Sequence, residues 1–457
     1  MPAHVFWLQH FDLIHYYFGV LFISVLLHHT IFSRFVFGIL DPLFYLEVSF
    51  IFTMTTAWYV FFVGYIQPEI YYTLVACQAL AYLGFVLVAP TKAQVIANRR
   101  RCTEVEAAPQ WSAFSLLLLK IGALCFLAAT LFDYSLAGIP ILRRFRQGAF
   151  SGSGGLGIIT RFEDIAFILI ALLVAGGLLY KARGRRIEGV LWLLVALGFA
   201  VLSGAKAGAL VVVQVIYVIY VLKSGAAARF ITMKSLAILG AVTLGAVIVV
   251  AAGTSVTGDL FKDLGVNRFV LAIITLAYRL VNFGDIFINS FPQNTIGNIS
   301  DREGWISLFA GVLSTFRLID PGSVPLPLGY ALLHYIFPGI GVVGGPNSYF
   351  SVFSYHYWGA FGSIVFSIAV GLCFGLGRRL VLLNGAAIFE SKSPTKSLSS
   401  ASLFLAGWIL MDSTTDPPYI VSRLVSVFLL LCFISPFVLA GWYAGYRRRL
   451  GRSVESA

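Results

Sequence analysis

The stretch LFYLEVSFIFTMTTAWYVFFVGY, residues 43–65, decides the fold because it carries one charged side chain, Glu47, in an otherwise apolar run. Two further stretches, residues 70–89 and 236–253, carry no charged side chain at all. Each is about as long as a helix that crosses the roughly 30 Å hydrocarbon layer of a bilayer. Backbone groups in lipid must bond within the segment, so these stretches predict membrane-spanning helices.

The whole chain has the same character, with 59% hydrophobic and 11% charged residues. Soluble domains have about 45–50% apolar residues, so a soluble globule is excluded. The net charge of +12 is spread over short loops, which argues against nucleic acid as a partner. Nothing in Met1–Asp12 predicts a cleaved signal, and we expect the first apolar segment to be retained.

Apolar runs and their punctuation predict an all-α polytopic membrane protein with about 11 transmembrane helices, within a range of about 10–13. The predicted spans are residues 13–32, 43–65, 70–89, 112–133, 162–180, 189–203, 207–222, 236–253, 357–377, 398–413 and 422–444. Basic loops near Arg100, Arg185 and Arg378 alternate with loops poor in basic residues. The positive-inside rule places the basic loops in the cytoplasm and the N-terminus outside.

Three regions follow from this count. Residues 1–253 form an N-terminal set of about eight spans with an outer loop at 134–161, and residues 357–457 form about three spans and a basic cytoplasmic tail. Residues 254–356 between them form a large outer loop region. Its apolar segments Val270–Phe287 and Trp305–Leu318 carry charges, which favours short interfacial or re-entrant helices. An extra spanning pair is the alternative.

The outer loop at 134–161 carries Arg143, Arg144 and Arg146, followed by a glycine-rich run. A guanidinium group can donate two parallel hydrogen bonds to phosphate oxygens, and glycine lets the backbone approach a phosphate closely. This loop is therefore a candidate phosphate site. Contact with anionic lipid heads is the alternative. Lys206 lies in a turn of small residues and either completes that anion site or only reaches toward the interface.

The large loop region supplies the other candidates. Tyr278, Asn282 and Asp285 share one face if residues 270–287 form a continuous helix, and Arg268 and Arg279 share another. Such a stripe suits a sugar-binding groove, although it is equally the wet face of an amphipathic helix. The remaining candidates are a general base, His356, a second histidine, His334, and three possible substrate contacts, Arg317, Asn347 and Tyr349.

Three patches of the sequence resemble the family of Wzy-type O-antigen polymerases, which join oligosaccharide repeat units. The first is Ser203-Gly204-Ala205-Lys206-Ala207-Gly208, similar to a small-residue turn of the family. The second is the arginine group before the glycine-rich run. The third is Gly345-Pro346-Asn347-Ser348-Tyr349, with Trp358-Gly359-Ala360-Phe361-Gly362 opening a span. In the related O-antigen ligases a histidine precedes the asparagine, whereas Pro346 stands here, which favours a polymerase.

The resemblance implies a GT-C-like membrane glycosyltransferase of the bacterial inner membrane that acts at the periplasmic face. Its substrate would be undecaprenyl-diphosphate-linked oligosaccharide, with His356, Arg279 and Lys206 as expected catalytic residues. Arginine and lysine would stabilise the leaving diphosphate, so we expect no metal and no other cofactor. Membrane lipids and a chain-length regulator are the other expected partners. A ligase and a transporter or flippase of lipid-linked sugars stay open as alternatives.

Overall fold

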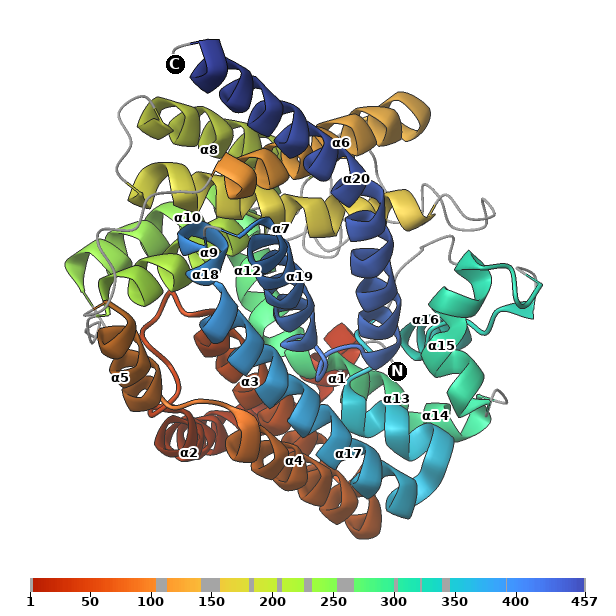
Figure 1. Ribbon diagram of the computed structural model, residues 1–457. Helices are drawn as coiled ribbons and strands as arrows, with labels where there is room; N and C mark the ends of the chain where they lie inside the picture. The colour runs from red at the N-terminus through yellow and green to blue at the C-terminus, as the bar shows by residue number, and fades with distance from the viewer. Residues whose placement is uncertain are drawn as a thin grey trace.

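The computed structural model describes residues 3–103, 113–140, 157–180, 185–203, 208–225, 232–252, 267–299, 303–320, 323–338, 346–391 and 393–455. All regular structure in these ranges is helical, as Figure 1 shows. Seven of the described helices are long and apolar enough to cross a membrane, and a bent pair, Arg268–Leu280 with Asn282–Ser290, would make an eighth. The prediction of an all-helical membrane protein is therefore confirmed.

Each predicted span coincides with a helix. These helices are α2 (Ile14–Phe32), α3 (Pro42–Phe62), α4 (Pro68–Val88), α6 (Ala113–Ala137), α7 (Gly157–Leu179), α8 (Arg185–Leu202), α9 (Gly208–Ser224), α10 (Met233–Ala252), α17 (Phe350–Asn384), α19 (Pro394–Leu410) and α20 (Pro417–Glu455). By length and composition, α8, α9, α10 and α19 are not among the seven candidate spans. The count of about 11 crossings thus stays a prediction.

Helix α17 folds back on itself at Gly359, whose φ of 67° and ψ of −167° are essentially confined to glycine. The rings of Phe353 and Phe366, on either side of the break, lie 6.1 Å apart. The start of the helix therefore lies beside its own middle. The backbone N–H groups of Tyr349 and Phe350 donate there to the carbonyls of Thr415 and Thr414, in the turn between α19 and α20.

Small residues bring α4 and the second part of α17 into close contact. A methyl group on Gly371 would lie 2.1 Å from the carbonyl oxygen of Ala81, and one on Gly84 would lie 2.9 Å from that of Ile368. Close approach through small residues is the usual basis of helix packing in membranes, where the hydrophobic effect does not drive helices together.

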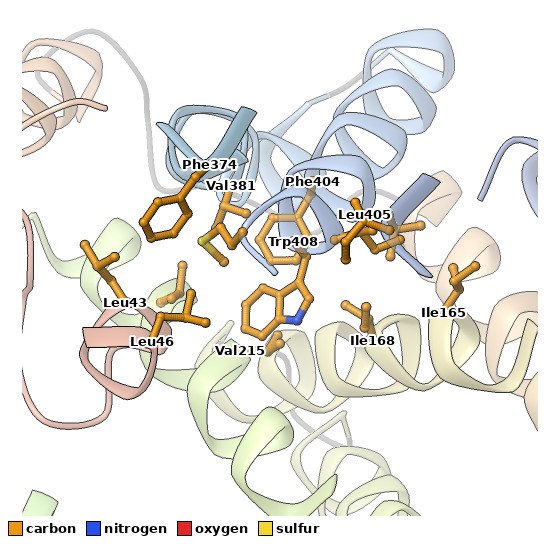
Figure 2. Close-up of a cluster of buried hydrophobic side chains, with 14 of the residues drawn as sticks. Leu43, Leu46, Ile165, Ile168, Val215, Phe374, Val381, Phe404, Leu405 and Trp408 are labelled. Atoms are coloured by element: carbon orange, nitrogen blue, oxygen red, sulfur yellow. The ribbon is translucent and has the colours of Figure 1, made fainter. Parts of the chain in front are cut away.

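The apolar core surrounds α19, which lies between α7 and the second part of α17 (Figure 1). Figure 2 shows its side chains meeting those of α3, α7, α9 and α17. The labelled residues of this cluster are Leu43, Leu46, Ile165, Ile168, Val215, Phe374, Val381, Phe404, Leu405 and Trp408. Helix α19 is thus central to the packing even though it is short for a span.

A buried ion pair joins the start of α3 to α17. Arg378 donates to both carboxylate oxygens of Asp41, at 2.7 and 2.6 Å, and both side chains are fully buried. Asp41 also accepts from the backbone N–H groups of Phe37 and Leu43. Arg378 was counted above among the basic residues of a loop, and that assignment is wrong because its charge is paired inside the helical bundle.

The described residues between 267 and 338 include five short α-helices: α12 (Arg268–Val281), α13 (Asp285–Ser290), α14 (Thr295–Asn298), α15 (Gly304–Thr315) and α16 (Leu328–Ile336). The predicted polar stripe of Tyr278, Asn282 and Asp285 required one continuous helix. The helix is interrupted, because a 3-10 turn at Asn282–Gly284 separates α12 from α13 and bends the chain by 46°. Tyr278 nevertheless stays next to Asn282 and within electrostatic range of Asp285. Helix α13 is also largely buried and packs against α3.

Candidate functional site

Four polar side chains meet where α20 begins beside α7. They are Asp164 of α7, Asp412 of the turn between α19 and α20, and Tyr419 and Arg423 of α20, and we refer to them as the turn cluster. Helix α19 ends at Leu410, and Pro417 starts α20 where its missing N–H costs nothing. Tyr419 and Arg423 are one helical turn apart, so they share the face turned toward α7.

Arg423 bridges the two carboxylates. Its Nη1 lies 3.5 Å from Oδ2 of Asp412, and its Nη2 lies 4.0 Å from Oδ2 of Asp164. The hydroxyl of Tyr419 donates to Asp164 Oδ2 at 2.6 Å, and the Arg423 guanidinium lies 5.2 Å from the Tyr419 ring centre. The arginine is thus oriented by a carboxylate on each side and an aromatic face.

The two carboxylates are more exposed to solvent than the arginine between them. The side chains of Asp164 and Asp412 are 47% and 40% exposed, against 13% for Arg423. Burial nevertheless raises the pKa of Asp412, the nearby negative charge of Asp164 raises it further, and Arg423 lowers it. A carboxylate that is surrounded by protein and still accessible is suited to accept a proton from a bound molecule.

A second arginine lies next to the turn cluster. Arg161, one turn before Asp164 on α7, donates through Nη1 to Thr315 Oγ1 at 3.1 Å and to the Gly311 carbonyl at 3.2 Å. It is close enough to Tyr419 for their charges to interact. Helices α7 and α20 and the turn between α19 and α20 therefore place two guanidinium groups and two carboxylates within one region.

The cluster is also within electrostatic range of α3. The hydroxyl of Tyr45 on that helix is influenced by Asp412 and, separately, by Arg279 of α12. Arg279 in turn interacts with Asp285 at the start of α13. Arg279, predicted as a catalytic cation, is thus linked to the turn cluster through Tyr45.

Behind the cluster, the start of α17 is tied to the same turn. Burial raises the pKa of Asp416 to about 6, while the backbone N–H of Tyr419 and the Ser348 hydroxyl lower it. Tyr349 is buried and donates through its hydroxyl to Gln78 Oε1 at 2.7 Å. Tyr349 therefore holds the fold at this point, and its hydroxyl is engaged within the core.

The other predicted residues lie apart from the cluster. Asn282 accepts from Trp7 Nε1 at 3.4 Å, Tyr278 packs against the core, and His356 lies with its ring against Tyr357. Arg268 is exposed at the start of α12, Arg317 is exposed after α15 with a φ of 53°, Asn347 is exposed before α17, and His334 is in the last turn of α16. Arg143, Arg144, Arg146 and Lys206 lie outside the described residues.

Sequence reasoning missed Asp412 and Arg423 as site residues, and it assigned Asp164 only to capping. One signal was present. Arg423 is a lone charge near the start of a long apolar run, and such a charge needs a partner. Its partners could not be read from the sequence, because Asp164 lies on a different helix.

The comparisons with known proteins returned no match: no family model, no curated protein and no solved structure matches this chain.

Proposed function

We propose that the protein is a membrane glycosyltransferase that joins undecaprenyl-diphosphate-linked oligosaccharide units into a surface polysaccharide. The observation that supports this best is the turn cluster with Arg161 beside it, since it combines guanidinium groups with an accessible carboxylate. Transfer from a lipid diphosphate requires both kinds of group. The leaving diphosphate gains negative charge, and the attacking hydroxyl loses a proton.

In this proposal Arg161 and Arg279 approach the diphosphate from α7 and α12, and the predicted cations Arg143, Arg146 and Lys206 complete its binding. Arg423 has another role, because its charge is already shared between Asp164 and Asp412. Guanidinium groups held in place before the reaction stabilise the developing charge without reorganisation. The described charges at the cluster nearly balance, so the additional cations are needed for net attraction of a diphosphate.

The arrangement in the membrane belongs to the same proposal. About 11 crossings, with the N-terminus and residues 254–356 on the outer side of a bacterial inner membrane, would expose the cluster to lipid-linked substrate there. A surface polysaccharide must be built on that side, and the donor arrives activated, so no nucleotide is required.

A transporter of lipid-linked sugars is the second candidate. The observation in its favour is that ionisable side chains lie buried within the helices, such as Glu47 in α3 and His28 in α2. Buried ionisable groups inside membrane helices often mark a transport path. A transporter moves labelled lipid-linked oligosaccharide across a vesicle membrane without lengthening it, whereas a polymerase lengthens it without needing a second compartment.

The test is incubation of purified protein with undecaprenyl-diphosphate-linked oligosaccharide extracted from the cells that make it, followed by gel separation of the products. We expect a ladder of polymer that persists in the presence of a metal chelator. Arg161→Gln and Arg279→Gln should reduce it about a hundredfold or more, since a few kcal/mol of transition-state stabilisation is lost.

Arg379→Gln is the matched control, because Arg379 is an exposed arginine on α17, next to the buried Arg378 and outside the cluster. It should give the wild-type ladder. If the wild-type protein makes no ladder but moves labelled lipid across vesicles, the transporter is the correct assignment.

A further inference from the structure

We propose that Asp412 is the general base that accepts the proton of the attacking sugar hydroxyl, and that Arg423 and Asp164 position it. This inference rests on the proposed function and assigns a residue that neither the sequence patterns nor the resemblance singled out. It stands on the geometry of the turn cluster, on the unequal contacts of its two carboxylates and on the accessibility of Asp412.

The two carboxylates differ in what holds them. Asp164 accepts the Tyr419 hydroxyl at 2.6 Å and faces Arg423 at 4.0 Å, so one of its oxygens is shared between two partners. Asp412 meets Arg423 at 3.5 Å through Oδ2. Oδ1 of Asp412 is therefore the carboxylate oxygen best placed to receive a proton. Asp164, held by Tyr419, helps to position Arg423.

The titratable and charged groups around Asp412 come from three elements. Arg423 faces it from α20, Asp164 from α7, and the Tyr45 hydroxyl of α3 lies within electrostatic range. His356, the base expected from the sequence, lies on α17 with its ring against Tyr357.

The acceptor hydroxyl gives its proton to Oδ1 of Asp412 while its oxygen forms a bond to the anomeric carbon of the donor chain. The bond between that carbon and the diphosphate oxygen breaks, and undecaprenyl diphosphate leaves with the electron pair. Asp412 then releases its proton to water, which restores the carboxylate for the next unit.

The experiment measures the pH dependence of kcat/KM for polymer formation. Because the carboxylate form is the active one, the rate should rise with pH through the pKa of Asp412. Asp412→Asn should lower the rate by about a hundredfold or more, the range that a general base supplies, and should abolish that rise. Asp412→Glu should retain part of the rate and the rise.

Two neighbours should move the midpoint of this rise in opposite directions. Asp164→Asn removes a negative charge that raises the pKa of Asp412, so the midpoint should fall. Arg423→Gln removes a positive charge that lowers the pKa, so the midpoint should increase. A purely structural role for these residues would reduce the rate without such a pair of opposite shifts.

Binding of radiolabelled undecaprenyl diphosphate separates a base from a binding residue. Asp412→Asn should bind this lipid as the wild type does, with the same amount of protein in the membrane. If the wild type makes a ladder and Asp412→Asn keeps more than a tenth of its rate, or if both neighbour variants leave the midpoint unchanged, the assignment of the base is overturned. If the wild type makes no ladder at all, the proposed function fails first and this inference fails with it.

Discussion

The ion pair between Asp41 and Arg378 should be the largest single polar contribution to the stability of the bundle. Arg378→Gln leaves the Asp41 carboxylate fully buried with only two backbone N–H groups as partners. Two charge-assisted hydrogen bonds, of 2.7 and 2.6 Å, are lost. At about 1.5–3 kcal/mol each, their loss agrees with the roughly 3–5 kcal/mol expected when one partner of a buried pair is removed.

The assay is thermal unfolding of the purified protein in detergent. At about 2 °C per kcal/mol, the lower end for larger domains, Arg378→Gln should lower the melting temperature by at least about 6 °C. Arg379→Gln, the exposed neighbour, should stay within about 1 °C of the wild type. The double variant Asp41→Asn with Arg378→Met should recover most of the loss, because asparagine keeps the cap of α3 and no buried charge remains.

A melting temperature of Arg378→Gln equal to that of Arg379→Gln would refute this reasoning. It would mean that the Asp41 carboxylate is reached by water or carries a proton, and that the ion pair adds nothing to the contact between α3 and α17.

Three further predictions concern packing, pH and topology. Gly371→Ala should destabilise the protein by about 1–3 kcal/mol in the same assay, because the added methyl group would lie 2.1 Å from the Ala81 carbonyl oxygen. Gly19→Ala is the control, because open space surrounds Gly19, and it should not lower the melting temperature. Equal melting temperatures of the two variants would contradict the close packing of α4 and α17. Burial raises the pKa of Asp416 from its ordinary value of 3.8 to about 6, so the stabilising contribution of this group is present below pH 3.8 and is lost as the pH rises toward about 6. Asp416→Asn should therefore remove this part of the pH dependence of the melting temperature. An unchanged pH profile would contradict this assignment to Asp416. A cysteine placed at Asn347 should react with an impermeant reagent in intact cells and one placed at Arg379 should not, and the reverse pattern would invert the proposed orientation.

The positions of the long helices could be predicted from the sequence because an apolar run is a local property. The runs at 43–65 and 70–89 coincide with α3 and α4, and the break after Ser203 separates α8 from α9. The same runs did not show which helices are interior. Hydropathy averages over all faces of a helix, so α19 and α13 were not recognised as parts of the core.

The candidate site could be predicted only in part. Arg279 was recognised from its charge in an apolar segment, whereas its proximity to Tyr45 depends on how distant parts of the chain pack. The continuous helix through Asn282 was wrong because a 3-10 turn follows Val281. The pairing of Arg378 with Asp41, 337 positions earlier, has no local signal, so Arg378 was assigned to a basic loop.

The reversal of the chain at Gly359 makes the position of Tyr349 along the axis of α17 depend on the backbone conformation of one residue. The nine residues from Phe350 to Trp358 would extend about 14 Å as a straight helix, and folded back they extend the same distance the other way. Rotation about this single glycine therefore decides between two positions of Tyr349 that differ by about 27 Å along the helix axis. Any side chain at residue 359 favours the straight helix. The hydrogen bonds from Tyr349 and Phe350 to the turn between α19 and α20 therefore depend on the absence of one methyl group.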